Sequence, residues 1–228
     1  DCTLDKAAHA TEHSIEVVVP FIQVVFPRAK IVPIVVSSHD MNVLNRFGQA
    51  LAKVLKNKNA LIVVSSDLSH YPAWADARIV DREILMAITT MDPAALRKNI
   101  HHNMNKNISG LATCACGEAP IIAAMVAARS LGAVRGEVVS YANSGDVAIG
   151  ERSRVVGYGA VVLAADAGAK ETVVPVKPAT TGQVSILTPN DKKKLLRLAR
   201  ETISRIFSTD TTPLARDLSP SLQQPRGV

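Results

Sequence analysis

An aspartate and a histidine three residues apart, Asp67 and His70, follow the short apolar run at 61–64. If that run is a buried strand, both side chains lie at the carboxyl edge of a sheet, where open α/β folds bind their ligands. An aspartate beside an imidazole fixes the tautomer of the ring and raises its basicity. The pair therefore suits a metal site or general acid–base chemistry. The structural alternative is that Asp67 caps the following turn and His70 is packed.

Cys116 stands at the entry to a predicted helix, and Cys114 lies two residues before it. The positive end of a helix dipole favours the thiolate, which is the form of cysteine that binds metals or attacks electrophiles. Two cysteines at this spacing do not form a zinc knuckle. The residues alone leave two interpretations open, a reactive thiolate and a free buried cysteine.

A third polar cluster, at 12–16, contains His13 and Glu16. In a helix these two side chains lie on one face, whereas in a strand they point to opposite faces. The valines at 17–19 favour a strand, and the polar residues before Pro20 favour the start of a helix. Both conformations remain open.

The elements that position these residues follow an α/β pattern, in which short β-branched runs alternate with amphipathic stretches. We predict buried strands at 31–37 and 60–66 with a helix at 42–55 between them, a unit that favours a parallel pair. Further helices are expected at 73–89, 93–101 and 118–131, and closing strands at 134–141 and 155–164, the last buried on both faces. The predicted fold class is α/β, with a mostly parallel or mixed central sheet flanked by helices.

The chain is expected to contain one domain at 1–165, a linker at 166–186 and an incomplete second domain at 187–228. The linker is rich in Ala, Gly, Thr, Pro and Val, and an amphipathic helix follows it. Because the chain opens with Asp1 and the second domain has one predicted helix, we expect a fragment cut at both ends.

Composition argues against several classes of partner. The net charge of +6 is concentrated after residue 165, where 10 Lys and Arg face 6 Asp and Glu. No aromatic residues interleave with these charges to stack on bases, so nucleic acid is not expected. Apolar runs are well short of the roughly 18 residues that span a bilayer, so no membrane is expected either. Three cysteines indicate a reducing compartment, and the cytoplasm is the expected location.

Five motifs, in this order, resemble those of the Memo family, also known as protein B of the AmmeMemoRadiSam system. They are Glu12-His13-Ser14-Ile15-Glu16 with Pro20-Phe21, Ser65-Ser66-Asp67-x-x-His70, Cys116-Gly117-x-x-Pro120-Ile121, Tyr141-Ala142-x-Ser144-Gly145-Asp146 and Val156-Gly157-Tyr158-Gly159-Ala160. The segments from Leu187 to Ile203 and from Leu222 to Val228 resemble the start of an AMMECR-type domain. Such fusions are a known arrangement, with a radical S-adenosylmethionine protein as the third member of the system.

The resemblance implies a fold similar to that of class III extradiol dioxygenases, with a metal held by histidines and a cysteine. By this resemblance Cys116 is a metal ligand, and Asp67 and His70 lie beside the metal, with His70 as acid/base or further ligand. His13 and Glu16 are expected to contribute to catalysis. The family's two N-terminal metal histidines lie in Pro-His-Ala-Gly and Gly-Pro-x-His segments, and this chain contains neither.

The function implied by the resemblance is that of an iron- or copper-dependent oxidoreductase acting on a small molecule or a peptide. One alternative is a non-catalytic module that binds a peptide or a protein in the same cleft. Another is a hydrolase with Cys116 as nucleophile and His70 as base. The radical S-adenosylmethionine protein of the same system is the expected partner.

Overall fold

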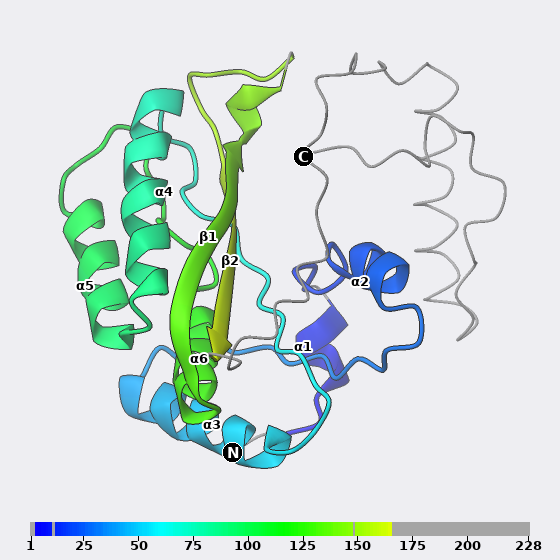
Figure 1. The fold of residues 1–228 in the computed structure, drawn as a ribbon. Coiled ribbons are helices and arrows are strands. Elements are labelled where there is room, and N and C mark those ends of the chain that lie inside the picture. The colour runs from blue at the N-terminus through cyan, green and yellow to red at the C-terminus, as the bar shows by residue number, and fades with distance from the viewer. Residues whose placement is uncertain (1–2, 11, 148, 166–228) are drawn as a thin grey trace, which may run out of the picture. The chain divides into compact units, whose positions relative to one another are not determined.

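The computed structural model describes residues 3–10, 12–147 and 149–165, which form a mixed α/β structure (Figure 1). The predicted linker and second domain, at 166–228, lie outside the described residues. The helices are α1 (Lys6–Ala10), α2 (Val19–Val25), α3 (Met41–Leu55), α4 (Trp74–Thr89), α5 (Pro93–Met104) and α6 (Glu118–Ser130). The strands are β1 (Ala133–Asn143) and β2 (Gly157–Ala165), with a short 3-10 helix, η1 (Ser144–Asp146), following β1.

The predicted helices are confirmed because their start signals are local. Asp40 begins α3, and its carboxylate accepts hydrogen bonds from the N–H groups of the first turn. Asp92 does the same for α5, with Pro93 in the first turn as expected. That helix runs to Met104, three residues beyond the predicted end, since the sequence contains no stop signal at His101.

The two closing strands are confirmed, and they pair with each other in antiparallel register, from Ala133 opposite Ala165 to Asn143 opposite Gly157. Helix α4 packs against both strands, and α3, α5 and α6 extend this helical side (Figure 1). The prediction that the strand at 155–164 is buried on both faces is wrong. Tyr158 and Val162 are about half exposed, because the described chain covers only one face of the hairpin.

Residues 31–37 and 60–66 differ from their predicted strands. Within the described part of the chain, neither segment has strand structure, and the sheet there is the two-stranded hairpin. Some of their apolar side chains are exposed, with Val32 at 81% and Leu61 at 69%, whereas Val36 and Val64 are partly buried against the core. A strand exists only where a second backbone accepts and donates its hydrogen bonds. The β-branched composition of these segments carries no information on whether such a partner is present.

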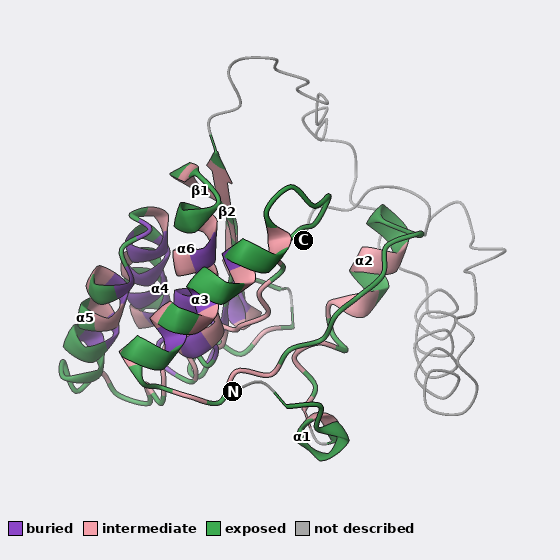
Figure 2. Cartoon of the chain, turned by 90° about the horizontal axis from the view of Figure 1, so that it is seen from below, coloured by how far each residue is buried: buried purple, intermediate pink, exposed green. Residues whose placement is uncertain are grey.

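The apolar core lies among the helices α3 to α6, where purple, buried residues gather in Figure 2. Leu44, Ile84, Leu96, Ile122 and Met125 are its largest fully buried members. The N-terminal helices α1 and α2 contain no buried residue. Among the described helices, none has both the length and the apolar character that crossing a membrane requires.

Candidate metal-binding site

The backbone that carries Asp67 and His70 is fixed by hydrogen bonds to distant parts of the chain. Five consecutive N–H groups, from Asp67 to Tyr71, each donate to a different residue. In order, the acceptors are Cys116 Sγ at 3.3 Å, Gly157 O at 2.9 Å, Asp81 Oδ1 at 2.8 Å, Thr113 O at 3.0 Å and Val155 O at 2.7 Å. Long-range contacts, and not the local sequence, therefore determine where the two side chains point.

Three potential metal ligands meet at this segment, namely Asp67, His70 and Cys116, whose ligand atoms all lie within 4.8 Å of one another. The imidazole Nε2 of His70 lies 3.5 Å from Asp67 Oδ2, which is too long for a good hydrogen bond. This nitrogen is buried and has no hydrogen-bond partner among the described residues. Because buried polar atoms almost always have a partner, an unpaired nitrogen beside a thiol and a carboxylate fits a bound metal ion.

Cys116 is held against this segment from the other side. Its own N–H donates to Asp67 O at 3.3 Å, and the N–H of Gly117 donates to Ser66 Oγ at 2.8 Å. A Cβ at position 117 would lie 2.6 Å from the Ser66 Cβ, so glycine is required for this close approach. The expectation that Cys116 stands at a helix entry is confirmed, since Gly117 is the residue before α6.

The neighbouring thiol has a different environment. Cys114 is fully buried in the core, and burial raises its pKa to about 11. Cys116 is exposed, and its sulfur faces Asp67 and Ser66. Cys114 is therefore a buried thiol of the core, and Cys116 is an accessible thiol.

His13 and Glu16 lie far from this arrangement in the sequence, and the structure does not bring them into the three-residue group. Both are exposed. Glu16 lies in a turn at 14–18 that leads into α2, and His13 directly precedes this turn. The N–H of Val17 donates to the carbonyl of His13, so this segment has helical turns and not an extended strand. The Glu12 carboxylate accepts the N–H groups of Ser14 and His13, and these bonds lower its pKa.

Asp81 is a buried residue behind the site that the sequence analysis did not single out. It is fully buried in α4, and burial raises its pKa against the opposing hydrogen bonds from Tyr141 and Ser69. The signal was present in the sequence. At helical spacing Asp81 shares a face with Ala77 and Leu85, so a carboxylate interrupts an apolar stripe.

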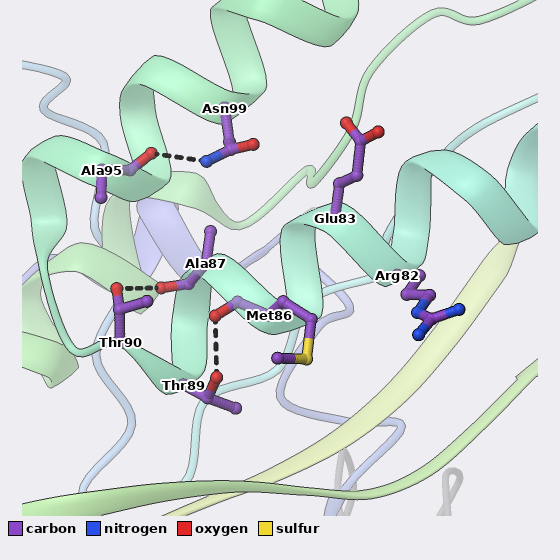
Figure 3. Close-up of a pocket in the computed structure, with 8 residues that line it drawn as sticks. All are labelled: Arg82, Glu83, Met86, Ala87, Thr89, Thr90, Ala95 and Asn99. Carbon is purple, nitrogen blue, oxygen red and sulfur yellow. Dashed lines mark hydrogen bonds between the residues drawn. The ribbon is translucent and has the colours of Figure 1, made fainter.

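A hollow of about 550 Å³ lies away from this group, along α4 and the start of α5 (Figure 3). It is lined by Arg82, Glu83, Met86, Ala87, Thr89, Thr90, Ala95 and Asn99. The hydroxyls of Thr89 and Thr90 and the amide of Asn99 bond to carbonyls of their own helices. Few polar groups remain to bind a ligand, so we place the functional site at Asp67, His70 and Cys116.

Comparison with known proteins shows the family to which this mixed α/β chain belongs. The family described as "Memo-like protein" matches residues 2–162, and the chain belongs to this family. A MEMO1 family protein of Methanopyrus kandleri is 37% identical over 162 residues, which cover 70% of this chain and 54% of the relative. A MEMO1 family protein of Aquifex aeolicus is 40% identical over 156 residues, covering 68% and 55%. The chain spans about half the length of the relatives it matches.

Proposed function

We propose that this Memo-family protein binds iron or copper through His70 and Cys116, with Asp67 beside the metal, and acts as an oxidoreductase. The observation that supports the proposal is the convergence of imidazole, carboxylate and thiol ligand atoms within 4.8 Å, from segments almost 50 residues apart. The buried, unpaired Nε2 of His70 adds to it. A nitrogen and a sulfur donor suit iron or copper better than magnesium, which prefers oxygen.

Each residue has a distinct role in this proposal. Cys116, as a thiolate, and His70 would hold the metal, and the Asp67 carboxylate would orient the imidazole. The bound metal would supply one-electron redox chemistry. Catechol ring opening is not proposed, because a thiolate here stands in place of the carboxylate of a His/His/carboxylate triad. His13 and Glu16 are proposed to act on the substrate from the N-terminal segment.

The same proposal extends to the whole protein. Its central sheet would be mostly parallel or mixed, with the segments at 31–37 and 60–66 paired as strands. Residues 187–228 would begin an AMMECR-type domain after a linker at 166–186. The protein would act in the cytoplasm within the AmmeMemoRadiSam system, beside its radical S-adenosylmethionine protein, on a small molecule or a peptide.

The test is the metal content of the full-length protein containing this chain, purified without oxygen and measured by mass spectrometry. We expect near-stoichiometric iron or copper in the wild type and its loss in Cys116→Ala. Cys114→Ala is the matched control, and because Cys114 is buried in the core and outside the ligand group, this variant should keep the metal. A metal-free wild type that also fails to bind added iron or copper would contradict the proposal and favour the peptide-binding alternative.

A further inference from the structure

The Asp81 carboxylate is fully buried and bonds to the backbone of the segment at 67–71, between Asp67 and His70. Its Oδ1 accepts the N–H of Ser69 at 2.8 Å, and Ser69 lies between Asp67 and His70 in the sequence. Because Ser69 is fully buried, this N–H would otherwise have no partner. Helix α4 therefore holds the segment at 67–71 at its centre.

This hydrogen bond differs from the other four that fix the segment at 67–71. Three of those N–H groups donate to backbone carbonyls, and the N–H of Asp67 donates to the sulfur of Cys116 itself. Asp81 is thus the one acceptor of the five that is a side chain outside the ligand group. A substitution at position 81 can remove this hydrogen bond while the acceptors of the other four remain in the protein.

The carboxylate is itself held in place by both strands. Its Oδ2 accepts the hydroxyl of Tyr141, in β1, at 2.8 Å. Gly157, in β2, leaves room for it, since a Cβ there would lie against Oδ2. The carbonyl of Gly157 also accepts the N–H of Leu68, and its N–H donates to Ser69 O, both at 2.9 Å. The hairpin, α4 and the segment at 67–71 therefore meet at one carboxylate.

We propose that Asp81, supported by Tyr141, is the positioning residue that keeps Asp67 and His70 directed at Cys116. The inference rests on the proposed metal site, to which it adds a residue that does not touch the metal. Without Asp81 the N–H of Ser69 is buried and unpaired, and the segment at 67–71 relaxes to satisfy it. Relaxation of this segment moves both Asp67 and His70.

The test compares Asp81→Leu with Asp81→Asn in the full-length protein, with Co²⁺ as the probe metal. Asparagine keeps a carbonyl oxygen for the Ser69 N–H, whereas leucine removes it. The readout is the thiolate-to-cobalt absorption band, which reports on ligation by Cys116 independently of overall folding. We expect Asp81→Leu to weaken Co²⁺ binding by about 10- to 100-fold, and Asp81→Asn to restore it to within a few-fold of wild type.

Leu96→Ala, in the core and outside the ligand group, controls for general loss of stability and should retain wild-type affinity for Co²⁺. Equal affinity in Asp81→Leu and the wild type overturns the inference, as does an equal loss in Leu96→Ala. Tyr141→Phe, which removes only the hydroxyl on Oδ2, provides the same test if Asp81→Leu does not fold, with a loss in the same direction expected.

A second readout separates this inference from the metal proposal. If the wild type shows no cobalt–thiolate band, the proposed function fails, and amide hydrogen exchange then tests the positioning role without metal. Asp81→Leu should accelerate exchange in the peptide covering residues 67–71 and leave α5 unchanged. Unaltered exchange in that peptide would overturn the role of Asp81.

Discussion

Cys114 and Cys116 are two residues apart, but their thiols are predicted to react very differently. Burial raises the Cys114 pKa to about 11 and closes the sulfur off from solvent, whereas Cys116 is exposed. At about pH 8, where ordinary thiols are partly ionised, iodoacetamide should alkylate Cys116 and spare Cys114. A Cys2→Ser background removes the third thiol, and peptide mass spectrometry measures the two modified sites.

Unfolding the protein in guanidinium chloride provides the control, because both thiols should then react at similar rates. Rapid alkylation of Cys114 in the native protein would show that the segment before α6 opens to solvent. Protection of Cys116 would show that its sulfur is enclosed. This result would contradict the accessibility that a metal ligand at a substrate site requires.

At the scale of the elements, α3 and α6 pack closely at Gly48. A Cβ at this position would lie 2.5 Å from Ala123 O and 2.7 Å from the Val126 Cβ, both in α6. Alanine in place of glycine favours an isolated helix by roughly 0.5–1 kcal/mol, whereas overpacking a core costs about 1–3 kcal/mol. The second effect is larger, so Gly48→Ala should lower the free energy of unfolding by about 1 kcal/mol, measured by urea denaturation.

Gln49→Ala, at the exposed neighbouring position of α3, is the matched control and should change stability by less than about 0.5 kcal/mol. A more stable Gly48→Ala variant would mean that helix propensity dominates. The two helices would then be free to move apart, and their close contact would not be a requirement of the core.

The difference between helices and strands also explains what the sequence could predict. A helix satisfies its own backbone, so local signals were sufficient. Apolar residues at helical spacing placed α3, and the cap Asp92 placed α5. A strand depends on a partner strand elsewhere in the chain. The composition at 31–37 predicted a strand, but within the described residues this segment pairs with no other strand.

In the candidate site, too, local features could be predicted from the sequence and long-range contacts could not. Asp67 and His70 are three residues apart, so local spacing alone made them neighbours. The contact between Cys116 and the backbone of Asp67 spans 49 residues, and only the family resemblance pointed to it. Asp81 interrupts an apolar stripe of its helix, but its partners follow from the packing of α4 against the strands that carry Tyr141 and Gly157, which the local sequence does not predict.

At the scale of the whole molecule, the buried Asp81 should give stability an unusual dependence on pH. Burial raises the pKa of this carboxyl from its ordinary value of 3.8. As pH rises above that value, the unfolded chain releases the proton while the folded protein retains it. The folded state then binds more protons than the unfolded state. The free energy of unfolding therefore falls as pH rises, until the folded pKa of Asp81 is passed.

Asp81→Asn removes this titration while keeping an oxygen for Ser69, so its stability relative to the wild type should increase as pH rises from about 4 to neutrality.

Asp146 supplies the opposite control. The Trp74 indole N–H and the Asn143 N–H both donate to its carboxylate and lower its pKa, so the stability of Asp146→Asn relative to the wild type should fall as pH rises toward about 4 and stay level from there to neutrality. Because Asp146 is exposed to solvent, that change should be small. Urea unfolding at a series of pH values measures both differences. A flat or falling difference for Asp81→Asn would show that the hydrogen bonds from Tyr141 and Ser69 outweigh burial, and that Asp81 is a stabilising charge in the native protein.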